Sequence, residues 1–362
     1  MDTIQLNINC RDWRYNGYFD KLRQRINQIT SPYGYTYVDF LTQRAADSFS
    51  IKVSYPRFFF GINAGIVNKS VEVLEVNRHL VNELSKIAEQ CEIGRIELDL
   101  IRVDIPFTVY KPEDMNFSDY LQVFRLMSIV YTETRKIKYG PTGIFNMNKL
   151  EVETVNFTNN SGNIEVCIYN QALNIQRKTQ SSFDYVSCQK KFPDLVNRIR
   201  IEVRKRISRK PFSPEQFSKF DVLGEYGNAH REFLLTHLFN TQVISNFIDE
   251  RINYLDNTFK DYLKDFGRIN YRAWLLWQKN NLYDYSVIRE VLKRNISNQS
   301  TYENAITRVN HILEDISFPK SSLEMLSAME YAVRNYEFDL NTAFEVGDIV
   351  KDETIFHDEV SE

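Results

Sequence analysis

Two segments far apart in the chain repeat one pattern, and this pattern restricts the possible folds more than any other feature. Residues 101–105 read Ile-Arg-Val-Asp-Ile, and residues 199–203 read Ile-Arg-Ile-Glu-Val. Alternating apolar residues are typical of a strand with one buried face, because successive side chains point to opposite sides. The arginine and the acid of each segment therefore share the other face. If the two strands pair in one sheet, we expect Asp104 and Glu202 to lie close together on an open face.

Two interpretations of this charged face remain open. In the first, Arg102 and Arg200 form a cross-strand ladder with the two acids and stabilise the sheet by about a few tenths of a kcal/mol per pair. In the second, Asp104 and Glu202 hold Mg²⁺ or Mn²⁺, which prefer oxygen ligands, and the two arginines bind a phosphate. The pattern by itself does not distinguish a structural ladder from a cation site.

The second strand ends in a cluster of cations, Arg204, Lys205, Arg206, Arg209 and Lys210. The whole chain has a formal net charge of −3, so its overall charge does not indicate a polyanionic partner. The cluster is either an ordinary exposed basic turn or a surface for the phosphate backbone of double-stranded DNA. In the second case each contact releases counterions and adds affinity.

The remaining periodicity predicts an α+β fold. We expect a mainly antiparallel sheet with helices on one face, of the split β-α-β type, followed by a helical domain. The expected helices are 18–29, 70–90 and 118–134, and the expected strands are 49–65, 94–110, 149–160, 163–173 and 198–206. In the strand at 94–110 the alternation changes phase near Leu100 and Ile101, which predicts a bulge.

Two prolines in 208–217 mark the expected domain boundary. We expect an α+β domain at 1–210, a helical domain at 211–345 and an acidic tail at 346–362. The segment 271–279, Tyr-Arg-Ala-Trp-Leu-Leu-Trp-Gln-Lys, is expected to contribute to a core.

Residues 283–313 are consistent with a helix-turn-helix. Two short amphipathic helices flank the polar turn Asn-Ile-Ser-Asn-Gln-Ser, with Ser300 as the expected cap. The second helix would present Thr301, Tyr302, Asn304 and Arg308 outward, and Tyr302 and Arg308 are candidate DNA contacts. The alternative is an ordinary helical hairpin with polar faces, because this segment has no dense basic flank.

The four cysteines are scattered and show no ligand spacing typical of zinc. They are expected to be reduced thiols of a cytoplasmic protein. The first residues lack the basic and apolar regions of a signal peptide, and no segment is long and apolar enough to span a membrane. His230 and His237 lie seven residues apart, too far for a helical chelate, and are expected to be structural.

Residues 51–206 resemble the core of the rolling-circle replication initiators of plasmids and filamentous phages. Four stretches with the helix between them carry the similarity: 53–65 with its Gly-Asn turn, 100–110 with its Arg-x-Asp strand, 154–173 with its hairpin and Ile-Tyr-Asn-Gln turn, and 198–206 with its Arg-hydrophobic-Glu strand. The resemblance rests on their order and spacing and covers under half of the chain.

The resemblance implies a DNA nicking activity in which a tyrosine attacks a phosphodiester that a bound metal polarises. Carried over to this sequence, Asp104 and Glu202 would hold Mg²⁺ or Mn²⁺, and Tyr226, the first tyrosine after the basic strand, would be the nucleophile. The chain departs from the family pattern in two ways. It lacks the His-hydrophobic-His motif, and Asn170 and Gln171 stand where the family commonly has Asp and Lys.

Three functions follow as hypotheses. The first is a plasmid or phage replication initiation protein that binds double-stranded origin DNA and nicks it through Tyr226. The second is a non-catalytic origin-binding protein that recruits a host helicase or other replication proteins through acidic residues 314–362. The third is a protein-interaction module without a DNA role. A homodimer is compatible with each of them, and no membrane partner is expected.

Overall fold

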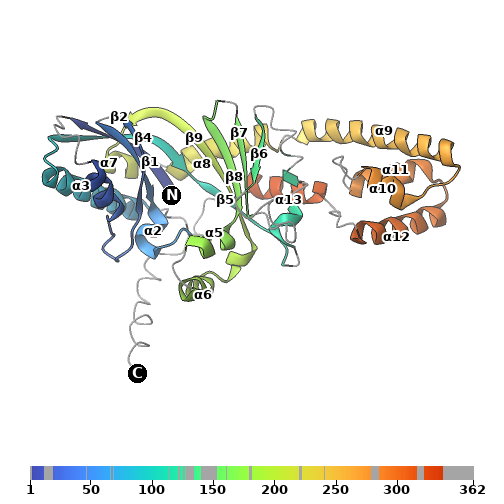
Figure 1. The fold of residues 1–362 in the computed structure, drawn as a ribbon, viewed down its shortest axis with the longest axis horizontal. Helices are drawn as coiled ribbons and strands as arrows, with labels where there is room; N and C mark the ends of the chain where they lie inside the picture. Colours follow the sequence, from blue (N-terminus) through green and yellow to red (C-terminus); the bar gives the residue numbers. More distant parts are fainter. Residues whose placement is uncertain are drawn as a thin grey trace, which may run out of the picture. The chain divides into compact units, whose positions relative to one another are not determined.

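A computed structural model of the chain describes residues 2–11, 19–45, 47–65, 67, 69–113, 115–120, 123, 124, 127, 134–139, 153–159, 161–178, 182–219, 222–239, 241–278, 285–315 and 322–336 (Figure 1). The chain divides into two compact units. The first comprises residues 1–108, 161–231 and 336–362, and the second comprises 109–160 and 232–335. Most of the predicted helix at 118–134 and the whole acidic tail at 346–362 lie outside the described residues. The predicted boundaries at 210 and 345 remain a prediction.

The first unit combines a sheet with helices. Its strands are β1 (Thr3–Arg11), β2 (Val38–Ala45), β3 (Ser48–Ser54), β4 (Arg95–Asp104), β8 (Ile164–Asn170) and β9 (Arg198–Pro211). Its helices are α1 (Phe19–Asn27), α2 (Tyr55–Phe60), α3 (Ser70–Gln90), α5 (Gln171–Lys178), α6 (Ser182–Lys191), η3 (Pro193–Asn197) and α7 (Pro214–Lys219). The division between the units falls within β5 (Pro106–Tyr110) and α8 (Val222–His237).

The strands of the first unit follow the order β2-β3-β1-β4-β9-β8, and β5 also pairs with β9. The pairs β1-β3, β1-β4, β2-β3, β4-β9 and β8-β9 are all antiparallel. The predicted α+β class with a mainly antiparallel sheet is therefore confirmed. The predicted bulge is confirmed as well: Gln5 pairs with Arg102 while Leu6 pairs with Leu100, which leaves Ile101 without a partner on β1.

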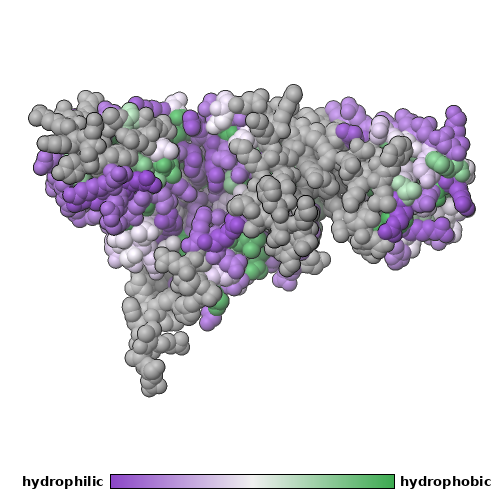
Figure 2. Space-filling model, viewed as in Figure 1, coloured by the Kyte–Doolittle hydropathy of each residue, from purple (hydrophilic) through white to green (hydrophobic). Residues whose placement is uncertain are grey.

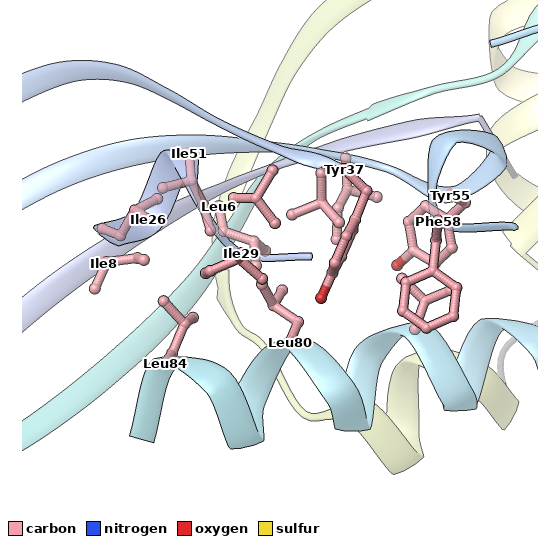
Figure 3. Packing of buried hydrophobic residues seen from close by; sticks show 14 of the residues in the cluster. Leu6, Ile8, Ile26, Ile29, Tyr37, Ile51, Tyr55, Phe58, Leu80 and Leu84 are labelled. Atoms are coloured by element: carbon pink, nitrogen blue, oxygen red, sulfur yellow. The ribbon is translucent and has the colours of Figure 1, made fainter. Parts of the chain in front are cut away.

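The core of the first unit lies between the sheet and α3. Leu6 and Ile8 of β1 and Ile51 of β3 point toward Leu80 and Leu84 of the helix (Figure 3). All five side chains are buried, and burial of each contributes about 1.5–3 kcal/mol. The outward surface of the same helix is hydrophilic (Figure 2), as expected of a helix that buries one stripe.

The opposite face of the sheet is polar because β1 alternates. Gln5 lies between Lys52 of β3 and Arg102 of β4 in the sheet register. Residues directly opposite each other on antiparallel strands share a face, so these three side chains lie on the side away from the apolar core. This polar face continues into β9 and β8 and carries the candidate site.

One predicted strand is partly wrong. The segment 49–65 is a strand only as far as Ser54, and Tyr55–Phe60 forms the short helix α2. Pro56 occupies the first turn of that helix, where its missing N–H costs nothing, and Gly61 ends it in the left-handed region at φ 72°. Burial of the aromatic side chains Tyr55 and Phe58 in the core determines the choice of helix over strand.

Among its described residues, the second unit contains β6 (Thr134–Tyr139), β7 (Thr154–Asn159), the short helix η2 (Phe117–Tyr120) and the following α-helices. The helices are α9 (Thr241–Phe266), α10 (Tyr271–Gln278), α11 (Tyr285–Asn295), α12 (Gln299–Asp315) and α13 (Ser322–Arg334). Trp274 and Leu275 are buried in a cluster with α9, α11 and α12, which confirms the predicted core segment. None of the helices among the described residues is long and apolar enough to cross a bilayer.

Candidate functional site

The two Arg-x-acid strands are neighbours in the sheet, as the sequence predicted. β4 and β9 pair antiparallel, with Arg102 opposite Arg206. On the other side of β9, Glu202 lies opposite Cys167 and Arg200 lies opposite Tyr169 of β8. The charged side chains of both strands therefore share the polar face of the sheet.

This face is not open at its centre, contrary to the prediction. Asp104, Arg200 and Glu202 are only 2%, 1% and 4% exposed. β9 has neighbours on both sides, and its polar groups bond to Thr108 of β5 and Tyr169 of β8. A charged side chain on an inner strand is solvated only where no neighbour covers it, and a single strand's sequence carries no information on that.

Glu202 is held by a dense set of hydrogen bonds. The Tyr169 hydroxyl donates to its Oε1 at 2.6 Å, and Arg204 donates to Oε2 through Nη2 at 3.1 Å and Nε at 3.3 Å. Burial raises the pKa of Glu202, but the charge of Arg204 and the Tyr169 hydrogen bond outweigh burial and bring that pKa to about 2. Glu202 is therefore ionised at neutral pH, and both of its oxygens already have donors.

Two further carboxylates lie within electrostatic reach of Glu202. Asp104 accepts a hydrogen bond at Oδ2 from Arg102 Nη2 at 2.8 Å, and its Oδ1 is buried without a partner. Burial raises the pKa of Asp104, Arg102 opposes that change, and Glu202 adds to it. Burial and the Glu202 charge raise the pKa of Asp2 to about 6. Each added negative charge thus makes the ionised form of its neighbours less favourable.

These carboxylates do not fit a divalent cation site. Among the described residues no group of three or more His, Cys, Asp or Glu side chains is arranged to hold a metal ion. Glu202 is already paired with Arg204 and Asp104 with Arg102, so the cation would have to displace guanidinium groups. Arg200 adds a further positive charge nearby. The geometry favours arginine–acid pairs over the cation site, but Arg102–Asp104 lies within β4 and Glu202–Arg204 within β9, and Arg200 does not join the expected cross-strand ladder.

Arg200 is not placed to contact a DNA phosphate. Its Nη1 donates to the Thr108 hydroxyl at 3.1 Å, and its other nitrogens are buried. The role of DNA contact assigned to it from sequence therefore needs correction, because the side chain lies inside the sheet's polar layer. Arg102 and Arg204 keep 20% and 28% of their side chains exposed, and both are tied to carboxylates.

The exposed cations lie further along β9. Lys205, Arg206, Arg209 and Lys210, here called the basic ridge, are all exposed. They belong to the strand, which continues to Pro211, and not to a turn after it. Arg209 forms an ion pair with Asp99, whereas no ion pair joins Arg206 or Lys210 to another residue in the part of the chain that the structure describes. Of the candidate DNA contacts on β4 and β9, these four are the exposed ones.

Tyr226 is not brought together with the two acids. It lies on α8, half-buried, and packs against the apolar core cluster that includes Phe217. Asp104 and Glu202 lie on the polar face. His230, one turn further along α8, is buried, and burial together with the charge of Lys205 lowers its pKa to about 4. It is a neutral, structural histidine at physiological pH, as expected.

The candidate helix-turn-helix consists of α11 and α12. Its cap is Asn298 and not Ser300: the backbone N–H of Thr301 donates to Asn298 Oδ1 at 3.0 Å, and Ser300 already lies in the first turn. Arg308 is exposed, as expected. Tyr302 is half-buried against the helical core, so only part of its ring is available to a partner.

Sequence reasoning missed several members of the polar face. Lys52 reaches it through its pairing with Gln5, and its charge acts on Asp2, Asp104 and Glu202. Lys52 lies on β3 and pairs with Gln5 of β1. The alternation of Thr3–Arg11 predicts β1 as a strand, but its position between β3 and β4 does not follow from the sequence.

The four cysteines are free and buried, as expected. Burial raises the pKa of Cys167, which faces Glu202 across the strands, to about 12, so its thiol is protonated at neutral pH.

Comparison with known proteins adds one finding. No protein-family model and no curated protein matches the sequence. A solved structure of the rolling circle replication initiator protein from Geobacillus stearothermophilus is similar, with 11% identity and a TM-score of 0.29 over 65% of this chain and 84% of that chain. The similarity is distant.

Proposed function

We propose that this chain is a replication initiation protein that binds double-stranded origin DNA without cutting it. The observation that carries DNA binding is the basic ridge: four exposed cations on one strand, beside the partly exposed Arg102 and Arg204. Adjacent side chains of a strand point to opposite sides, so Lys205 and Arg206 face different ways, and each cation that contacts a phosphate adds affinity by releasing counterions. The replication role is supported by the resemblance of residues 51–206 to rolling-circle initiators.

Binding without nicking is the best-supported of the functions expected from sequence. Nicking needs a tyrosine hydroxyl and a cation at one place. Here Tyr226 packs against the apolar cluster, and the carboxylates of Asp104 and Glu202 already accept hydrogen bonds from arginines. Binding needs neither feature, because the cations of the basic ridge are exposed.

The test is a salt titration of binding to duplex DNA that flanks the protein's own gene, measured by fluorescence anisotropy. For about three or four phosphate contacts, log K should fall against log salt with a slope of about −3 to −4. Replacing Lys205, Arg206, Arg209 and Lys210 by Ala should make the slope shallower by about one for each phosphate that the protein no longer neutralises. Unchanged affinity of this ridge variant, or a wild-type affinity insensitive to salt, would contradict the proposal.

A matched control carries the same number of Lys→Ala and Arg→Ala changes elsewhere on the first unit, at the exposed residues Lys21, Arg23, Lys86 and Arg95. We expect its slope to equal that of the wild type. Incubation of the protein with the same DNA in supercoiled form and Mn²⁺ should produce no nicked circle. Nicking that disappears in Tyr226→Phe would overturn the non-catalytic part of the proposal.

A further inference from the structure

The chain leaves the described part of the first unit beside the polar face. Tyr336 is buried, and its ring contacts Phe107 of β5 with centroids 5.4 Å apart. The backbone oxygen of Tyr336 accepts a hydrogen bond from the Arg231 guanidinium, and its phenol lies within electrostatic reach of Arg200. Residue 336 is thereby held close to the start of β9, the strand that carries the basic ridge.

The residues that follow Tyr336 are the chemical opposite of the ridge. Residues 337–362 contain nine Asp and Glu residues and a single cation, Lys351. These residues lie outside the described part of the chain, so the inference uses only their sequence and the position of Tyr336. Carboxylates spaced along a chain offer oxygen acceptors to guanidinium and ammonium groups much as phosphates do.

The length of the acidic segment is sufficient for it to reach the whole ridge. An extended chain spans about 3.3 Å per residue, so 26 residues reach on the order of 85 Å. The ridge ends at Lys210, ten residues after Arg200 on the same strand, which corresponds to about 33 Å. Attachment at Tyr336 therefore allows the carboxylates of 337–362 to reach each cation of the ridge.

We propose that the acidic segment 337–362 binds the basic ridge and competes with DNA for it. The ridge is thus an interaction surface with an occupant from the same chain. Exposed ion pairs are individually weak, so duplex DNA with its dense charge displaces the segment. The segment would reduce origin binding and non-specific binding by the same factor, because either DNA has to displace it from the same cations. The effect on DNA binding rests on the proposed function, whereas occupancy of the ridge does not.

The first experiment uses the full-length chain with its nine acidic residues in 337–362 replaced by Asn or Gln. At low salt this amide variant should bind duplex DNA about five-fold more tightly than the wild type. This factor follows if the tethered segment has an effective concentration of about 1 mM and a dissociation constant for the ridge of about 0.2 mM. The difference should vanish at high salt. A control replaces nine exposed carboxylates elsewhere, namely Asp20, Glu89, Glu92, Glu113, Asp249, Glu250, Asp261, Asp265 and Glu303. A gain equal in the control and the amide variant would reduce the effect to net charge and overturn the inference.

The second experiment contains no DNA. A fluorescent peptide with the sequence of residues 337–362 is titrated into the amide variant, with and without the ridge substitutions at Lys205, Arg206, Arg209 and Lys210. We expect salt-dependent binding that the ridge substitutions abolish and that the exposed-cation control at Lys21, Arg23, Lys86 and Arg95 retains. If the peptide binds but DNA does not, the proposed function is wrong, and the binding of segment 337–362 to the ridge is supported. If DNA binds the ridge but the peptide does not, this inference alone fails.

Discussion

Replacement of Glu202 by Gln tests whether the buried carboxylate is the electrostatic centre of the polar face. Glu202 accepts hydrogen bonds from Tyr169 and Arg204 and lies at 4% exposure. Removing its charge leaves the Arg204 guanidinium without its closest counter-charge, and breaking a buried pair in this way costs about 3–5 kcal/mol. We therefore expect the free energy of unfolding at pH 7 to fall by about that amount.

The pKa of Glu202 gives a second route to the same magnitude. Folding lowers that pKa from 4.5 to about 2, which corresponds to about 3 kcal/mol of stability. Because the folded pKa is the lower one, this stability is present above pH 4.5 and is lost as the pH falls through about 2. The two routes agree, so the wild type and Glu202→Gln should differ fully at pH 7 and progressively less in acid.

The assay is urea unfolding followed by circular dichroism and tryptophan fluorescence at pH 7 and at pH 3. The matched control is Glu165→Gln, which removes the same charge from the same guanidinium, since Glu165 Oε2 lies 3.5 Å from Arg204 Nη1. Glu165 is 32% exposed, so its loss should cost at most about 1 kcal/mol. A loss below about 1 kcal/mol for Glu202→Gln, or equal losses in both variants, would show that burial does not set the strength of this interaction.

Three shorter predictions follow. Asp2→Asn should raise the free energy of unfolding at pH 8 and leave it nearly unchanged at pH 4. Burial raises the pKa of Asp2 to about 6, so ionisation of Asp2 destabilises the fold at higher pH. Urea unfolding at the two pH values checks this, and an equal effect at both would contradict it. Asn298→Ala should cost about 1 kcal/mol and Ser300→Ala much less, because only Asn298 caps α12; equal losses in thermal melts would contradict this assignment. Mn²⁺ should leave the unfolding midpoint of the wild type unchanged, and a rise that Asp104→Asn removes would restore the cation site.

Much of the sheet was readable from local pattern. The apolar, Arg, apolar, acid alternation of 101–105 and 199–203 predicted two strands with charged faces, and the phase change near Ile101 predicted the bulge that the β1-β4 register contains. These features depend on the two-residue period of a strand, which a single segment displays. Where aromatic burial competes with alternation, as at 55–60, the local pattern indicated a strand and the fold contains a helix.

The candidate site was only half readable. The identity of its charged residues came from the sequence, while their environment did not. Arg200 and Arg206 occur six residues apart in one basic run, yet the first is buried against Thr108 and the second is exposed. Nothing in that run distinguishes them, since burial depends on the strands beside β9, which the run does not contain.

The amino-acid order of this chain set which segments become strands and on which face their charges lie, because side-chain alternation is a property of each strand taken separately. Only the assembled sheet decided that Glu202 is a buried partner of Arg204 and that the basic ridge remains at the surface. The physical reason is that desolvation is set by neighbours from β4, β5 and β8, which lie close in space and far apart in sequence, whereas the Glu202–Arg204 pair itself lies within β9.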